Sequence, residues 1–301
     1  MKTPVVAVVG QLARDLVLSV DGLPSAGSAA DATARREQLG GKGANQAVGL
    51  TQLGAQARLV AVAGEDSAGD ELLDQARRDG VDVRAVVRRG PLTGLIVEVL
   101  EPDGTWRYVQ HLPESVLLTE RDVVAAGAVI AGADAVLVQL QQPAAAALAA
   151  ARIGHDAGRL VVLDGAPQER RDDLLAAADV VRADEQEARL LLGGTPTAGS
   201  ARALLDNGPR LLALGVTDGN LFVWRDGHLH LPLTAENVVD TTGGGDAFTA
   251  ALTVSLLRGE DPATAARWAV AASGATVGHP SGRPDLAGAD LRKRVSELAG
   301  E

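Results

Sequence analysis

Short runs of apolar residues alternate along the chain with segments whose apolar positions repeat at helical spacing. Short apolar runs bounded by glycine, proline or polar residues are typical of buried strands. These runs are Val5–Val9, Leu59–Ala63, Ala135–Val138, Leu160–Leu163, Val180–Val181 and Leu211–Leu214. Strands that alternate with helices predict an α/β fold, in which a parallel sheet is wrapped by helices.

Helix signals lie between the apolar runs. Glycine follows two of the helical segments, at Gly54 and Gly80, and glycine commonly ends a helix. Thr119 and Asp261 are of the types that cap helix N-termini, and Asp261 precedes a proline, which is favoured at the first helical position. The predicted helices are Ala44–Leu53, Asp70–Arg78, a segment that begins at Glu120, Pro143–Ala151 and a segment from Asp261 to about Thr276.

Two regions break this alternation. Leu16–Leu39 shows weak period-two patterning, and Val83–Gln110 contains Leu95–Leu100 and Thr105–Val109, joined by the turn signal Pro102-Asp-Gly104. Strands without intervening helices predict a small sheet that projects from the main body and could act as a lid or a dimer face. We therefore expect one domain over 1–301, with lid strands from about 16–39 and 83–110.

The composition narrows the classes of function. The chain has 301 residues, 46% of them hydrophobic but only 2% aromatic, so its core has to be built from Ala, Val and Leu. A net charge of −11 without a long basic run argues against nucleic acid as a partner. The absence of cysteine excludes disulfides, thiolate zinc sites and a cysteine nucleophile. With no segment of membrane-spanning length and no signal-peptide pattern, we expect a cytoplasmic protein without a membrane partner.

The most informative motif is Asp240-Thr-Thr-Gly-Gly-Gly-Asp246, which leads directly into the apolar helical run Ala247–Leu252. Glycine inside a regular element costs about 0.5–1 kcal/mol relative to alanine, so three in a row indicate a backbone that takes unusual dihedral angles or approaches a ligand. A helix N-terminus offers unpaired N–H groups and the positive end of the helix dipole, which together bind anions. A phosphate site beside a carboxylate is what phosphoryl transfer to a hydroxyl requires.

Asp246 has two interpretations. Aspartate is a favoured N-cap residue, and the carboxylate could simply cap the helix. The accompanying glycines, threonines and Asp240 favour a general base instead, and the positively polarised helix end should then keep the carboxylate ionised at neutral pH. A Walker A loop needs Gly-x-x-x-x-Gly-Lys-Ser/Thr, and no such run occurs in the sequence.

A second glycine-rich motif, Gly40-Gly-Lys-Gly-Ala-Asn-Gln46, precedes a predicted helix. Glycine lets the backbone approach a ligand closely, and Lys42 and Asn45 add donors that suit a polyhydroxylated ligand. The alternative is a glycine turn with Asn45 exposed in the first helical turn. Asp15 is a third candidate, because it follows the first predicted strand, and open α/β sheets bind ligands beyond the carboxyl ends of their strands. The alternative for Asp15 is a solvated loop residue.

The two motifs together resemble the N- and C-terminal signatures of the ribokinase-like (PfkB) family of carbohydrate kinases, and most of all its ribokinase members. The first signature continues through Gly54 and Gly64-Glu-Asp-Ser-Ala-Gly69, and the similarity extends over nearly the whole chain. The resemblance implies a ribokinase-like three-layer α/β/α fold with a mostly parallel central sheet and a small β-sheet lid. It also implies transfer of the γ-phosphate of ATP to a sugar hydroxyl, with ribose to ribose 5-phosphate as the expected reaction, and a homodimer formed through the lid.

The resemblance assigns roles to particular residues. Asp246 would take the proton from the sugar hydroxyl, and Gly243, Gly244 and Gly245 would form the anion hole. The residues implied in sugar binding are Asp15, Gly41, Lys42, Asn45 and Gln141, together with Asp246. The residues implied in nucleotide binding are Asp184, Leu214, Gly215, Thr217, Gly219, Gly245 and Ser273.

The resemblance also implies two metal ions. The family's Asn-x-x-Glu motif, which helps to place Mg²⁺, corresponds to Asp184-Glu-Gln-Glu187, so that Glu187 matches and Asp184 replaces the asparagine. The alternative is a pair of acidic residues in the first turn of a helix, which the dipole favours. A monovalent cation, expected to be K⁺, would lie near the anion hole at Asp240, Thr242 and Asp285.

Two positions depart from the ribokinase pattern. Ala13 stands where an asparagine contacts the sugar, and Gln141 stands at the position of an acidic sugar ligand. Each loss removes a polar contact worth about 0.5–1.5 kcal/mol. Another pentose, a fructose-like ketohexose or an adenosine-like nucleoside therefore stays open as the substrate. A non-catalytic nucleotide- or sugar-binding protein on the same fold is a further alternative.

Overall fold

The apolar runs form the strands of the main sheet, and their residues are buried on both faces. A computed structural model of the chain describes residues 2–233, 238, 241–278, 283–286 and 290–300. Every residue of β1 (Val5–Val9) is buried, with Val6 and Val8 in one hydrophobic cluster and Ala7 and Val9 in another. Successive side chains of a strand point to opposite faces, so each face of the sheet is covered by its own layer of helices.

Eight strands form the main sheet, in the order β14-β13-β12-β11-β10-β9-β1-β4. Neighbours from β12 to β4 are parallel, whereas β13 is antiparallel to both β12 and β14. The strands other than β1 are β4 (Gln56–Val60), β9 (Ala135–Gln139), β10 (Leu160–Asp164), β11 (Val180–Ala183), β12 (Leu211–Val216), β13 (Gly219–Trp224) and β14 (Gly227–Pro232). The mostly parallel sheet is confirmed, and the antiparallel edge hairpin β13–β14 is an addition that the apolar runs do not predict.

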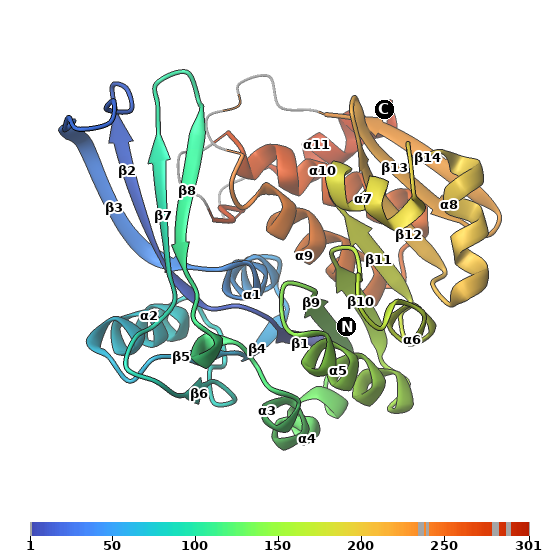
Figure 1. Cartoon of the computed structure of the whole chain (residues 1–301). Helices are drawn as coiled ribbons and strands as arrows, with labels where there is room; N and C mark the ends of the chain where they lie inside the picture. The colour runs from blue at the N-terminus through green and yellow to red at the C-terminus, as the bar shows by residue number, and fades with distance from the viewer. Residues whose placement is uncertain (1, 234–237, 239–240, 279–282, 287–289, 301) are drawn as a thin grey trace.

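Helices cover both faces of this sheet (Figure 1). One face carries α1 (Lys42–Gln52), α2 (Ser67–Arg78), α9 (Gly244–Leu257) and α10 (Pro262–Thr276), and α11 (Leu291–Ala299) packs on α10. The other face carries α3 (Glu120–Ala125), α4 (Gly127–Ala131), α5 (Ala144–Asp156), α6 (Arg171–Ala176), α7 (Glu185–Leu192) and α8 (Ala198–Leu204). Short 3₁₀ turns lie at Glu114–Val116 and Leu205–Asn207. The three-layer α/β/α arrangement is confirmed, and all five predicted helices are present with shifted ends.

A second sheet of four strands projects from the main body, on the left in Figure 1. Its order is β3-β2-β7-β8, and the strands are β2 (Ala13–Val20), β3 (Ala32–Gly40), β7 (Leu95–Leu100) and β8 (Trp106–His111). This confirms the small sheet predicted in an α/β chain. The apolar run Leu59–Ala63 is divided, because its last two residues form β5 (Val62–Ala63), which pairs with β6 (Val87–Arg88) instead of continuing the main sheet.

The carboxyl ends of β1, β9, β10 and β11 point toward the N-termini of α1 and α9, under the small sheet (Figure 1). In open α/β sheets this edge is where ligands bind. The start of α1 packs directly against this edge. The backbones of Gly10, after β1, and Gly43, in α1, are so close that a Cβ added to Gly10 would lie 2.9 Å from the Cα of Gly43. Within the described part of the chain, no helix has the length and apolar character needed to cross a bilayer.

Candidate active site

A cavity of about 370 Å³ lies between the small sheet and the carboxyl ends of the parallel strands. Strands β7 and β8 contribute Ile96, Glu98, Trp106, Tyr108 and Gln110 to its lining. The rest of the lining comprises Gln11, Asp15, Gly41, Lys42, Asn45, Gln141, Arg182, Asp184, Thr241, Thr242, Gly243, Gly245 and Asp246. Both glycine motifs therefore meet at one cavity, although they are far apart in the sequence.

The glycines of the triplet pack closely against neighbouring groups. Gly243 has a φ of +77° and is the N-cap of α9, and a Cβ there would lie 2.8 Å from the backbone of Arg283. A Cβ on Gly244 would come within 2.6 Å of a methyl group at the end of α10, and one on Gly245 within 2.7 Å of Arg182 Nη2. Glycine is required at Gly243 by backbone conformation and by the Arg283 backbone, whereas a side chain at Gly244 or Gly245 would displace neighbouring side chains.

The N-terminus of α9 presents backbone donors toward this corner. The first helical hydrogen bond of α9 runs from Ala247 N to Gly243 O, 3.0 Å apart. The N–H groups of residues 244–246 precede that bond, as the first N–H groups of a helix do. Together with the helix dipole they can bind a phosphate oxygen.

Asp246 is buried in the first turn of α9, where two amide side chains of α1 donate to its carboxylate. Asn45 Nδ2 donates to Oδ2 (3.1 Å) and Gln46 Nε2 donates to Oδ1 (3.2 Å). The N-cap of α9 is Gly243, so the interpretation of Asp246 as a simple cap is wrong. Asn45 is buried as well, so its interpretation as an exposed turn residue is also wrong.

The protonation of Asp246 differs from the expectation. Burial raises its pKa to about 7, while the charge of Lys42 opposes this shift and the charge of Asp164 adds to it. A helix N-terminus stabilises a negative charge by about 0.3–1 kcal/mol, which is less than one pKa unit. Burial outweighs the helix dipole, so in the protein alone this carboxyl group holds its proton to a higher pH than an ordinary aspartate does.

Arg182, in β11, lines the cavity although the sequence argument does not single it out. Its Nη1 donates to Oδ1 of the buried Asp164, 3.0 Å away. Gln46 Nε2 donates to Asp164 Oδ2 (2.7 Å) as well as to Asp246, so polar contacts connect Arg182 to Asp246. The sequence does contain a signal for Arg182. Asp164 and Arg182 carry opposite charges at the ends of successive apolar runs, and in the structure they are directly paired on β10 and β11.

Lys42 begins α1 directly after Gly41, which has a φ of +83°. Burial lowers the pKa of the Lys42 ammonium, but the charges of Asp164, Asp246 and Glu187 outweigh burial, and the net pKa lies above its usual value. Lys42 therefore carries a full positive charge into the cavity. Lys42 and Arg182 are the basic side chains at the end of the cavity next to Gly245, where the carboxylates of Asp184 and Asp246 also lie.

Asp15 lies in β2 and is buried, so it is not a solvated loop residue. A Cβ on Gly40, its neighbour on β3, would collide with the Asp15 carboxylate, so glycine leaves the space that this side chain occupies. Burial raises the pKa of Asp15 to about 7, and the negative charges of Glu98 and Asp246 add to the shift. Glu98, on β7, is a lining residue that the sequence argument does not identify.

Gln141 lines the cavity and is held by a chain of hydrogen bonds. Gln139 Nε2 donates to Gln141 Oε1 (2.8 Å), and Gln139 Oε1 accepts from the backbone N–H of Gln11 (3.1 Å). Ala13 is fully buried at the start of β2 and presents no polar group to a ligand. Gln11 lines the cavity near this point and supplies an amide there.

Asp184 and Glu187 form a reciprocal capping box at the N-terminus of α7. Glu187 N donates to Asp184 Oδ1 (2.8 Å), and Asp184 N donates to Glu187 Oε2 (2.9 Å). Burial raises the pKa of Glu187, against the opposing effects of the Asp184 N–H and the charge of Lys42. Capping uses one oxygen of each carboxylate, which agrees with the alternative interpretation of this pair as acidic residues in the first turn of a helix. The other oxygen of each carboxylate is still able to order metal-bound water.

Two of the predicted nucleotide residues, Asp184 and Gly245, line the cavity, whereas the others do not: Leu214, Gly215, Thr217, Gly219 and Ser273. Leu214 and Gly215 lie near the carboxyl end of β12, and a Cβ on Gly215 would lie 2.7 Å from Glu185 N, so β12 packs directly against the start of α7. Thr217 Oγ1 donates to Glu185 Oε1 (2.8 Å), and Gly219 begins β13. Ser273 Oγ in α10 would be 3.2 Å from a Cβ on Gly244, which places this hydroxyl beside the triplet.

The predicted monovalent-cation site lies only partly within the described residues. Asp240 lies outside the described residues. Thr242 lines the cavity and donates to Glu98 Oε1 (3.4 Å), whereas Asp285 is exposed. Among the described residues, no group of three or more histidine, aspartate or glutamate side chains is arranged to hold a metal ion.

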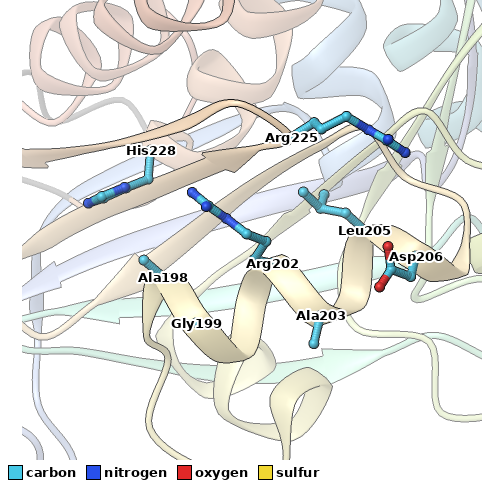
Figure 2. A pocket seen from close by; sticks show the side chains of 8 residues that line it. All are labelled: Ala198, Gly199, Arg202, Ala203, Leu205, Asp206, Arg225 and His228. Carbon is cyan, nitrogen blue, oxygen red and sulfur yellow. The ribbon is translucent and has the colours of Figure 1, made fainter.

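A second hollow of about 590 Å³ lies between α8 and the β13–β14 hairpin. It contains none of the predicted site residues. In Figure 2, Arg202 reaches from α8 toward the strands, while Arg225 extends away from both Arg202 and His228. These side chains do not converge on one point, so we place the candidate active site in the cavity under the small sheet.

Comparisons with known proteins agree with this geometry. The family model described as pfkB family carbohydrate kinase matches residues 4–287. Ribokinase from Bacillus subtilis is 28% identical over 299 residues, which cover 97% of this chain and 98% of the relative. The bifunctional ribokinase/ribose-5-phosphate isomerase A of Fructilactobacillus sanfranciscensis is 29% identical over 261 residues, and the match covers 83% of this chain but only 48% of that protein.

A solved structure extends the similarity to three dimensions. Arabidopsis thaliana ribokinase complexed with ribose and ATP superposes with a TM-score of 0.78 at 26% identity, covering 99% of each chain. The ribokinase-like fold is thereby confirmed, with its mostly parallel sheet and small extra sheet. The glycine triplet, the buried aspartate beside it, the family match and this superposition lead to one conclusion: the chain belongs to the pfkB family of carbohydrate kinases.

Proposed function

We propose that this carbohydrate kinase transfers the γ-phosphate of ATP to a sugar hydroxyl, with Asp246 as the general base. The observation that carries the proposal is the position of Asp246, buried next to the N–H groups of residues 244–246 and facing a cavity large enough for a sugar. A hydroxyl placed at this carboxylate would be beside the phosphate-binding donors. General-base catalysis of this kind contributes about 10²–10⁴ in rate.

Lys42 and Arg182, the basic side chains next to Gly245, assist both removal of the hydroxyl proton and transfer of the phosphate. Lys42 and Arg182 favour the ionised form of Asp246, which is the form that can accept the hydroxyl proton. The same two cations and the backbone N–H groups of α9 would stabilise the charge on the transferring phosphate. Gln46 and Asn45 hold the carboxylate oxygens in place, which keeps the base oriented.

The fit of Mg²⁺ is supported by the remaining oxygens of Asp184 and Glu187. Mg²⁺ usually keeps several water ligands and is bound through few carboxylates plus substrate phosphates, so a water-mediated site without a cluster of three acidic residues suits it. When bound, it would neutralise phosphate charge. For K⁺ one of the three residues, Asp240, lies outside the described residues, so K⁺ enters no step of the mechanism and remains a prediction at Asp240, Thr242 and Asp285.

Ribose is the acceptor that the relatives suggest, since several are named ribokinases and one was solved with ribose and ATP. Gln141, Ala13 and the lining residue Glu98 leave another sugar or a nucleoside as the second candidate, because each changes the polar groups available to the ligand. The nucleotide would lie along Leu214–Gly219 and Ser273.

The small sheet offers a surface for a second copy of the chain. All six residues of β8 are exposed, and Val109 is 71% exposed. Pairing between lids would cover this surface, so we propose a homodimer of single-domain 1–301 chains joined through their lids. Light scattering coupled to gel filtration would give twice the monomer mass, and a monomer at micromolar concentration would refute this part.

The deciding experiment measures ADP formation from ATP over a panel of pentoses, hexoses and nucleosides, with Asp246→Asn alongside. The kinase proposal requires sugar-dependent ADP formation that is lost in Asp246→Asn while nucleotide binding is retained. Binding of nucleotide or sugar without turnover on any acceptor would identify a non-catalytic binding protein instead.

A further inference from the structure

Among the described residues that line the cavity, the basic side chains lie at one end only. Lys42 and Arg182, together with the carboxylates of Asp184 and Asp246, line the end next to Gly245, where the phosphate would be. Asp15 and Glu98 lie at the end formed by the small sheet. A substrate whose hydroxyl is at Asp246 would therefore place its other end between two carboxylates.

The register of the small sheet brings these carboxylates to one face. In the parallel pair β2–β7, Asp15 is opposite Ile96 and Val17 is opposite Glu98, so Asp15 and Glu98 are diagonal neighbours. Residues two apart on a strand share a face, and diagonal neighbours are close enough for long side chains to meet. Both side chains line the cavity.

One carboxylate oxygen of Asp15 has no hydrogen-bond partner among the described residues. Asp15 is 8% exposed, and its Oδ1 accepts no hydrogen bond from the described residues. The Gly41 N–H and the charge of Arg283 favour the ionised form, but burial, Glu98 and Asp246 favour the protonated form more strongly. A buried carboxylate facing another one is costly unless a positive group lies between them.

Two aromatic rings complete this end of the cavity. Trp106 and Tyr108 line it from β8, with ring centroids 4.3 Å apart, and Tyr108 is directly opposite Glu98. The chain has 3 Trp, 1 Tyr and 2 Phe, so two of its few aromatic residues are at this one place. Aromatic faces attract cations, and exposed rings with adjacent carboxylates are the groups that recognise an ammonium ion.

We infer that the preferred acceptor is a sugar or sugar-like polyol carrying a protonated amino group, which Asp15 and Glu98 hold beside Trp106 and Tyr108. This inference rests on the proposed kinase function and specifies its substrate class. An ammonium group has three donors and a positive charge, so it can satisfy both carboxylates together. A neutral hydroxyl can donate to Asp15, but it leaves the repulsion between the two carboxylates in place.

The experiment compares matched pairs of acceptors that differ in one substituent, such as glucosamine with glucose and 1-amino-1-deoxyfructose with fructose, with cytidine and ribose as further arms. The readout is kcat/KM for ADP formation at pH 7 in the native protein, in Glu98→Gln and in the control Glu101→Gln. Glu101 directly follows the strand that carries Glu98, but it does not line the described cavity. We expect at least one amine to exceed its neutral partner by about tenfold, since a close charge pair shielded from water is worth at least that factor. Glu98→Gln should remove the preference, and Glu101→Gln should keep it.

Binding of the same amines without nucleotide is measured by calorimetry on the native protein at pH 6 to 9, so the test does not depend on folding of the variants. Affinity should fall as pH exceeds the pKa of the amine. Phosphorylation of neutral sugars in preference to every amine, or an amine preference unchanged in Glu98→Gln, would overturn the inference while leaving the kinase proposal standing. Preference for cytidine over the amino sugars would also overturn it, in favour of a nucleoside. Tight, Glu98-dependent amine binding without any phosphate transfer would instead refute the proposed function and leave the inference intact.

Discussion

Asp164 and Arg182 are directly paired residues on adjacent parallel strands, and their side chains form a salt bridge of 3.0 Å where the two strands end. Asp164 is almost fully buried and Arg182 is largely buried. A buried pair of this kind adds little net stability, because desolvation offsets the attraction. Because Arg182 lies beside Gly245, the contribution of the salt bridge is to hold a positive charge next to the anion site.

Arg182→Met should lower kcat by about 10²-fold, because it removes a preorganised charge from the phosphate position. The sugar KM should change little. The variant leaves Asp164 buried without its partner, so stability will also fall. Arg182→Met combined with Asp164→Asn removes that penalty, and steady-state kinetics should still show the loss of kcat. Recovery of kcat in the double variant would mean that Arg182 acts only through packing. Arg189→Met, in an exposed pair with Glu185, is the control.

Gly243→Ala should destabilise the protein and abolish turnover. The residue combines a positive φ with a Cβ position 2.8 Å from the Arg283 backbone. Gly259→Ala is a matched control, since Gly259 has a φ of +81° but open space around its Cβ position. The strain of a positive φ alone costs about 1–2 kcal/mol, so thermal unfolding should show a clearly larger loss for Gly243→Ala. Equal losses would argue against the crowding at the triplet.

The pH dependence of kcat/KM should reflect the raised pKa of Asp246. A base must be ionised to accept a proton, so activity on a neutral sugar should fall as pH drops below about 7, by about tenfold per unit. Asp15 has a similarly raised pKa, so its protonation adds to the same fall of kcat/KM on the acidic limb of the pH profile. Kinetics from pH 5 to 9 would show this limb. An acidic limb near pH 4 would contradict the raised pKa of the base.

Asp246→Asn should stabilise the protein at alkaline pH. The folded-state pKa of Asp246 is about 7, above the ordinary aspartate value of 3.8, so the unfolded chain loses this proton first. Ionisation therefore reduces stability as pH rises from about 4 to about 7, and the neutral amide avoids that loss. Calorimetry at pH 8 should show a melting temperature about 5 °C higher than that of the native protein, with little difference at pH 4. A lower melting temperature at pH 8 would be inconsistent with a costly buried charge.

Glu187→Gln should raise the Mg²⁺ concentration needed for half-maximal activity, with partial rescue at high Mg²⁺, because it removes one carboxylate that can order metal-bound water. Asp184→Asn should retain most activity, since the asparagine oxygen can still accept from Glu187 N and keep the capping box. Mg²⁺ titrations of both variants at saturating ATP test this difference. Equal Mg²⁺ requirements in all three proteins would remove Glu187 from the metal site.

The sequence predicts those parts of the site that are encoded locally. The glycine triplet with Asp246 and the Gly40–Gln46 run are each contiguous in the sequence, and each run leads into a helix N-terminus, where Gly41 and Gly243 adopt a positive φ. Arg182 and Glu98 are not predictable in the same way. Their function depends on strand pairing, which brings Arg182 beside Asp164 and Glu98 beside Asp15. The ionisation of Asp246 was expected from the helix dipole, whereas burial, a tertiary property, controls it.

The hydrogen bonds that orient the Asp246 carboxylate join residues 201 and 200 positions apart in the sequence. During synthesis on the ribosome, α1 would emerge long before α9 exists, so the amides of Asn45 and Gln46 could not yet bind the Asp246 carboxylate. Contacts of such long range form late in folding. Competence for phosphate transfer should therefore appear as one of the last events in the maturation of a newly made chain.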